Sequence, residues 1–157
     1  AKRRVICKPG ATLDKIRGAL AEVEVSSPET LIICHVGTND LKRTRSEDLL
    51  AKYRKLISDL KAKTSRVAIT SILPRINDDD EMYSKLTYTN RALDTICKSE
   101  GVSFINLFDD FRGRPDLFLK DGLHLNDLGN ARLGRLLHIG TKKFYALRQG
   151  DQRAPIR

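Results

Sequence analysis

A chain of 157 residues is long enough for one domain with a buried core, and its 40% hydrophobic and 31% charged residues are typical of a folded globular protein. The longest apolar run, residues 31–36, is too short to cross a bilayer, and no charged-then-apolar leader opens the chain. The net charge of +9 raises the general affinity for polyanions, but a solvated surface explains it equally well.

The cysteines and histidines do not form a metal-binding pattern. Cys7, Cys34 and Cys97 are odd in number and are spread over apolar stretches, so we expect them to be buried as small hydrophobic side chains. Zinc ligands would be clustered more closely. The sequence therefore predicts an intracellular protein, cytoplasmic or nuclear, with no membrane span and no need for a metal or another cofactor.

Strand-like and helix-like segments alternate along the chain. Apolar runs predict strands over residues 4–7, 31–36, 67–73 and 102–107, and amphipathic spacing predicts helices over 12–23, from Ser46 to Lys63, from the acidic loop 77–81 to Gly101, and after Asn126 or Asp127. This order predicts a flavodoxin-like three-layer α/β/α sandwich with a parallel sheet. We expect the domain over residues 1–147 and a basic tail over residues 148–157.

Three loops are expected at the carboxyl ends of the strands, where ligands bind in such sheets. Asp121 and His124 lie three residues apart in one loop, so the carboxylate can accept the Nδ1–H and leave Nε2 free as a general base. Asn39, in a turn after a strand, is a suitable amide donor to a developing oxyanion. Gly10, in the remaining loop, can present an unobstructed backbone N–H.

These loops resemble the conserved blocks of the SGNH (GDSL-like) hydrolases. Residues 37–40, Gly-Thr-Asn-Asp, resemble the third block, and residues 121–124, Asp-Gly-Leu-His, resemble the final Asp-x-x-His block. Residues 8–11 take the place of the second block, and residues 71–75 resemble the segment between the blocks. The pattern covers most of the chain, and it is similar to the esterase domain in the first open reading frame protein of some vertebrate LINE retrotransposons.

The resemblance implies a role for four residues: His124 as general base, Asp121 as its orienting acid, and Asn39 and Gly10 as oxyanion-hole donors. Other polar candidates are given structural roles. We expect His35 to be a hydrogen-bonded core histidine, His138 to be a surface or core residue of the last helix, and Asp40 to brace the turn that holds Asn39.

The first block of the family, a strand followed by Gly-Asp-Ser with the nucleophilic serine, has no counterpart before Gly10. In the strand order 2-1-3-4-5 this first strand is central, so a slot is expected between strands 4–7 and 31–36. Each unmade buried hydrogen bond costs about 1–3 kcal/mol. We therefore expect residues upstream of Ala1 in the parent protein, or another segment, to fill the slot.

Two functions remain open from the sequence. The resemblance implies a serine esterase for short acyl esters such as acetyl esters, with the serine supplied from outside this chain. The alternative is a catalytically inactive module that binds RNA or protein within a retroelement ribonucleoprotein, alone or as a homo-oligomer. The presence of Asp121, His124 and Asn39 together favours the esterase, because a decayed site has no reason to keep all of them.

Overall fold

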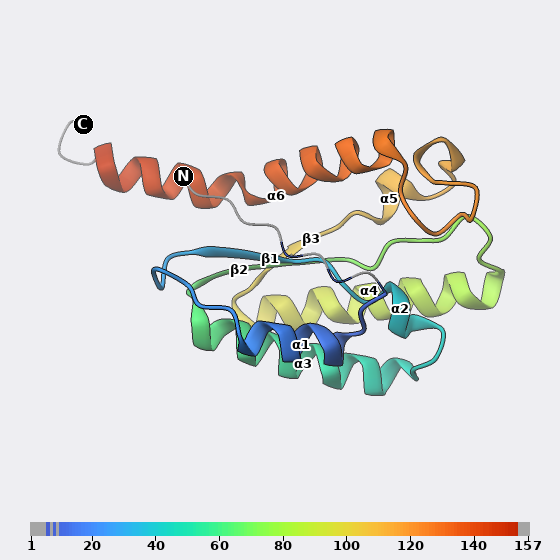
Figure 1. Ribbon diagram of the computed structural model, residues 1–157, viewed down its shortest axis with the longest axis horizontal. Helices are drawn as coiled ribbons and strands as arrows, with labels where there is room; N and C mark the ends of the chain where they lie inside the picture. Colours follow the sequence, from blue (N-terminus) through green and yellow to red (C-terminus); the bar gives the residue numbers. More distant parts are fainter. Residues whose placement is uncertain (1–5, 7, 9, 154–157) are drawn as a thin grey trace.

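One parallel sheet forms the middle layer of the protein (Figure 1). The computed structural model describes the backbone of residues 6, 8 and 10–153, and side chains as far as Tyr145. Within this part, β1 (Leu31–Cys34), β2 (Arg66–Thr70) and β3 (Ser103–Ile105) lie in the order β1-β2-β3. Leu31 is opposite Arg66, and Ala68 is opposite Ser103. The predicted parallel α/β architecture is confirmed, although each strand is shorter than its apolar run.

Helices cover both faces of the sheet (Figure 1). On one face lie α1 (Leu13–Ala21), α3 (Ser46–Lys63) and α4 (Asp80–Glu100), and on the other lies α6 (Asp127–Arg153). Each side has its own apolar core. The first core contains, among others, Leu49, Tyr53, Leu56, Ile57, Ile69, Leu86 and Leu93, and the second contains Ala68, Ile105, Leu107, Phe111 and Leu117.

The predicted helix ends are set by capping contacts. Thr12 Oγ1 accepts a hydrogen bond from Lys15 N at the start of α1, and Asp79 Oδ1 accepts one from Met82 N at the start of α4. Gly101 ends α4 with φ +69°, a conformation that glycine adopts without strain. Of the two candidates before α6, Asn126 is the cap, because its Oδ1 accepts from the backbone N–H three residues on.

Short elements join the strands to the helices that follow them. α2 (Thr38–Leu41) follows β1, and α5 (Phe108–Phe111) follows β3. A 3₁₀ turn (Pro115–Leu117) then leads to the loop before α6. All three lie near the carboxyl ends of the strands, on the right in Figure 1.

Several sequence-based expectations concern residues outside the described part. The predicted strand 4–7 includes residues 4, 5 and 7, which lie outside it, so its pairing with residues 31–36 stays a prediction. Among the described residues, β1 pairs only with β2. The backbone of α6 continues to Arg153, and the expected boundary after residue 147 also stays a prediction. No helix of the described residues is long and apolar enough to cross a membrane.

The cysteines behave as predicted where they are described. Cys34 and Cys97 are free and buried, whereas Cys7 lies outside the described residues. Burial raises the pKa of each of these two thiols to about 12, so neither is a thiolate at neutral pH.

Candidate active site

Asp121 and His124 form a hydrogen-bonded pair in the loop before α6. The carboxylate Oδ2 lies 2.5 Å from the imidazole Nδ1, and Oδ1 accepts hydrogen bonds from Leu123 N and His124 N, each at 2.9 Å. The same carboxylate therefore fixes both the ring and the backbone of the histidine. With Nδ1 engaged in this way, Nε2 is the ring nitrogen left for chemistry.

The electrostatics of the pair suit a carboxylate that stays ionised. The side-chain hydrogen bond with His124 and the two backbone N–H donors lower the pKa of Asp121 to about 2. An ionised carboxylate at this position stabilises an imidazolium whenever the ring takes up a proton. The His124 side chain is 67% exposed, so its ring is accessible from solvent.

Backbone contacts shape the loop that carries the pair. Phe118 and Leu125 form an antiparallel bridge at its base, and Leu119 N donates to His124 O at 2.8 Å. Gly122, with φ +68°, makes the reversal between Asp121 and His124. A tight turn of this kind brings two residues three apart into contact, as the sequence predicts.

The Asn39 turn, which the structure forms as the four-residue helix α2, docks onto the start of α1. Asn39 Nδ2 donates to Ala11 O at 3.1 Å, and the buried carboxylate of Asp40 accepts from Leu13 N at 2.9 Å. Gly10 precedes this contact, is exposed, and has φ +70° with open space around its Cα. The structure thus brings the Asn39 turn and the Gly10 segment together, and one Asn39 amide hydrogen remains for another acceptor.

Asp40 has the structural role that the sequence predicts, but through a different contact. It caps the first turn of α1, where the N–H groups and the helix dipole favour a carboxylate. Burial raises the pKa of Asp40, while the hydrogen bond from Leu13 N opposes that shift. Asp40 therefore fixes the distance between α1 and the turn that carries Asn39.

Arg75 connects the two halves of the candidate site, and sequence reasoning gave it no role. Its guanidinium Nη2 donates to Thr38 O at 2.8 Å, in the Asn39 turn. The next residue, Ile76, donates its N–H to Gly122 O at 3.0 Å, in the Asp121–His124 loop. The signals in the sequence are the place of Arg75 in the loop after β2, at the end of the sheet where both other loops lie, and the resemblance of residues 71–75 to a family segment.

The remaining histidines lie outside these contacts. His35 Nδ1 is 2.7 Å from Thr70 Oγ1, so the predicted hydrogen bond is confirmed. The residue as a whole is exposed, whereas burial of the ring lowers its pKa, so the predicted place in the core is met only in part. β1 ends before His35, and α6 packs against β3 on the far side of β2, which leaves His35 uncovered by described residues. His138 is exposed on α6, as expected.

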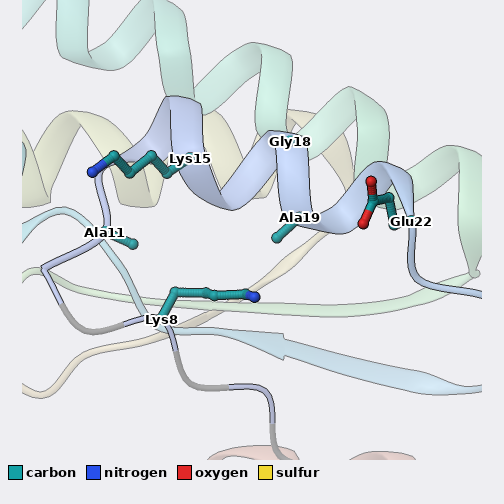
Figure 2. Close-up of a pocket in the computed structure, with 6 residues that line it drawn as sticks. All are labelled: Lys8, Ala11, Lys15, Gly18, Ala19 and Glu22. Carbon is teal, nitrogen blue, oxygen red and sulfur yellow. The ribbon is translucent and has the colours of Figure 1, made fainter.

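A hollow of about 440 Å³ is lined by Lys8, Ala11 and the face of α1 that carries Lys15, Gly18 and Ala19. Figure 2 shows Lys8 extending beneath α1 along this face. Among the described residues, the His124 ring forms a hydrogen bond with Asp121 and with no serine hydroxyl. The structure therefore brings the predicted acid and base into contact, and it separately holds Asn39 against Ala11, the residue that follows Gly10.

Comparisons with known proteins address the family and the fold of the whole chain. Residues 3–132 match the GDSL-like Lipase/Acylhydrolase family. The esterase domain of the ZfL2-1 ORF1 protein from a zebrafish retrotransposon is 30% identical, with 85% of this chain and 84% of that chain covered and a TM-score of 0.55. No curated protein sequence gives a significant match.

More distant solved structures share the fold. A GDSL-like lipase from Bacteroides thetaiotaomicron is 18% identical, with 85% of this chain and 72% of that chain covered and a TM-score of 0.72. Axe2, an acetylxylan esterase from Geobacillus stearothermophilus, is 16% identical, with 83% and 68% covered and a TM-score of 0.70. At these identities the likeness concerns the flavodoxin-like fold alone.

Proposed function

The chain belongs to the GDSL-like lipase/acylhydrolase family, and from this premise we propose that it supplies the acid, the base and the oxyanion-hole donors of a serine esterase. The contact between Asp121 Oδ2 and His124 Nδ1 is the observation that carries the proposal. This contact sets the tautomer and orientation that a general base in an acyl transfer needs.

Each group has one task in the proposed reaction. A serine from a segment outside these 157 residues gives its hydroxyl proton to His124 Nε2 while its oxygen attacks the ester carbonyl carbon. Asn39 Nδ2 and Gly10 N donate to the oxyanion that forms. The imidazolium, held by Asp121, then protonates the leaving alkoxide and the serine keeps the acyl group. Water then gives a proton to His124 Nε2 and attacks the acyl carbon, and the imidazolium returns the proton to the serine oxygen as the acid is released.

Carboxylic esters with short acyl groups, such as acetyl esters, are the proposed substrates. The His124 ring is 67% exposed on a surface loop. A long acyl chain would need an apolar channel to leave water, whereas an acetyl group needs little more than the oxyanion donors and the base. The acetylxylan esterase among the structural neighbours is consistent with this choice.

Hydrolysis of p-nitrophenyl acetate tests the proposal. We would compare the 157-residue chain with a form extended upstream of Ala1 by the residues of its parent protein. We expect turnover in the extended form and its loss in His124→Ala. His138→Ala, an exposed histidine on α6, is the matched control and should keep the activity. Equal turnover in the His124→Ala and His138→Ala variants would disprove the role of His124.

The alternative is a catalytically inactive module that binds RNA or protein within a retroelement ribonucleoprotein. The net charge of +9 and the similarity to a domain of a retrotransposon ORF1 protein support it. In this role the chain would act inside the cell, as a monomer or a homo-oligomer. The absence of ester turnover in both forms, together with RNA binding that weakens steeply with salt, would favour this alternative.

A further inference from the structure

A second hollow lies on the outer side of the helix layer, between α3 and α4, which pack side by side (Figure 1). It has a volume of about 330 Å³ and is lined by Arg54, Tyr88, Arg91, Ala92, Thr95 and Ile96. We call it the α3–α4 groove. It belongs to the layer opposite α6 and contains none of the residues of the candidate active site.

Tyr88 gives the groove an open aromatic surface. Tyr88 is 57% exposed, and its ring stacks on no other aromatic ring among the described residues. Tyr53, by contrast, is fully buried and Tyr83 contacts Phe108. An exposed ring beside an apolar floor favours stacking with a flat ligand.

Two arginines flank the ring without a carboxylate partner. Arg54 and Arg91 are exposed and form no ion pair with any described residue. Other basic side chains of the same helices are paired, as Lys52 is with Asp14 and Lys61 with Glu100. The positive charge of the groove is therefore available for an anion.

A second group of basic side chains lies in the loop before α3. Lys42, Arg43 and Arg45 are exposed there. Two contacts hold this loop and the start of α3 against α4. Lys85 Nζ donates to Thr44 O at 2.7 Å, and Thr89 Oγ1 lies 3.4 Å from Ser46 Oγ. Exposed basic side chains thus lie both in the groove and in the loop before α3, and the exposed carboxylates of Glu47 and Asp48 lie between them along the chain.

We propose that the α3–α4 groove binds single-stranded nucleic acid, with a base stacked on Tyr88 and neighbouring phosphates held by Arg54 and Arg91. Stacking needs a base whose face is free, which a single strand offers and a duplex hides. An acidic peptide would use the arginines but not the ring face. The groove and its ligand do not depend on the proposed ester hydrolysis.

Binding of a fluorescein-labelled oligouridylate of roughly ten nucleotides to the full chain, followed by anisotropy, tests the proposal. Tyr88→Ala is expected to weaken binding about tenfold, since stacking on one aromatic ring has an effect of this order. In Arg54→Ala/Arg91→Ala, the slope of log K against log salt should fall by roughly 0.7 for each lost phosphate contact. All three residues are exposed, so the variants are expected to fold.

Matched variants on α6 separate a defined groove from diffuse attraction. Tyr145→Ala removes a ring that is 46% exposed, and Arg135→Ala/Lys142→Ala removes two exposed charges. These variants should bind as the unmodified chain does. Equal losses of binding affinity in the groove variants and the α6 variants would overturn the proposal. Unchanged binding in Tyr88→Ala, together with full competition by polyglutamate, would also overturn it and would indicate a surface for acidic protein segments instead.

Discussion

The substitution Gly37→Ala tests how closely the turn carrying Asn39 is packed. Gly37 lies between β1 and α2 with φ +119°, which an alanine adopts only with strain. A Cβ placed there would lie 2.2 Å from Tyr53 Oη and 2.8 Å from Ile72 Cγ1. Tyr53 is fully buried and its hydroxyl donates to Val36 O at 2.7 Å, so it has no free space to move into.

The expected cost combines two effects. Backbone strain at a positive φ costs about 1–2 kcal/mol. Forcing a methyl group into a packed core costs about 1–3 kcal/mol, and a broken Tyr53–Val36 hydrogen bond would raise this further. We therefore expect the free energy of unfolding to fall by about 3–5 kcal/mol, a large share of the ~5–15 kcal/mol of an ordinary domain.

Urea denaturation followed by circular dichroism measures this loss, and Gly101→Ala is the control. Gly101 also has a positive φ, +69°, but no atom lies within 4 Å of its added Cβ. It should lose only the strain, about 1–2 kcal/mol. If the two variants lose the same stability, the packing of Gly37 against Tyr53 is not what holds the turn, and the reasoning is refuted.

Further substitutions at three positions concern single hydrogen-bonding side chains. Asp40→Ala should cost about 1–3 kcal/mol in urea denaturation by leaving a buried N–H of α1 unpaired, whereas Asp40→Asn, which still offers an acceptor, should cost clearly less. Asn126→Ala should lower the free energy of unfolding by about 1–2 kcal/mol through the lost cap of α6, seen as a lower Tm. The lowered pKa of Asp121, about 2 against its ordinary 3.8, contributes stability that is fully present above 3.8 and lost as the pH falls toward 2. Urea midpoints measured across this range should therefore depend less on pH in Asp121→Asn, and an unchanged dependence would contradict the pairing with His124.

Local patterns made the helices and their ends predictable from the sequence. The start of α3 at Ser46, the end of α4 before Gly101 and the cap at Asn126 depend on side chains within one turn of the helix end. The Asp121–His124 contact is predictable for the same reason, since one tight turn joins residues three apart. The Asn39 turn was found from its position after an apolar strand, and the resemblance to a family block then added its role.

Features that depend on distant segments were not predictable. The apolar run 31–36 indicates a buried strand, yet His35 is exposed because the covering helix packs over β3. The connection between the two loops at Arg75 depends on distant acceptors. The Arg75 side chain donates to Thr38 O, 37 residues away, and the N–H of Ile76 donates to Gly122 O, 46 residues away. The ion pairing that leaves Arg54 and Arg91 without a partner among the described residues likewise depends on where acidic residues of other elements lie.

The placement of the proposed oxyanion donors, Asn39 and Gly10, follows from helix docking rather than from the nucleophile. Asp40 holds the first turn of α1, and Asn39, the neighbouring residue, reaches the carbonyl of Ala11 just before it. Gly10 therefore keeps its place relative to Asn39 for as long as α1 stays docked on α3, where Arg17 contacts Asp59 at 2.7 Å. None of these contacts involves a serine, so the proposed oxyanion donors can be in place before a nucleophile arrives. A segment that brings a serine would then meet a preorganised pair of hydrogen-bond donors.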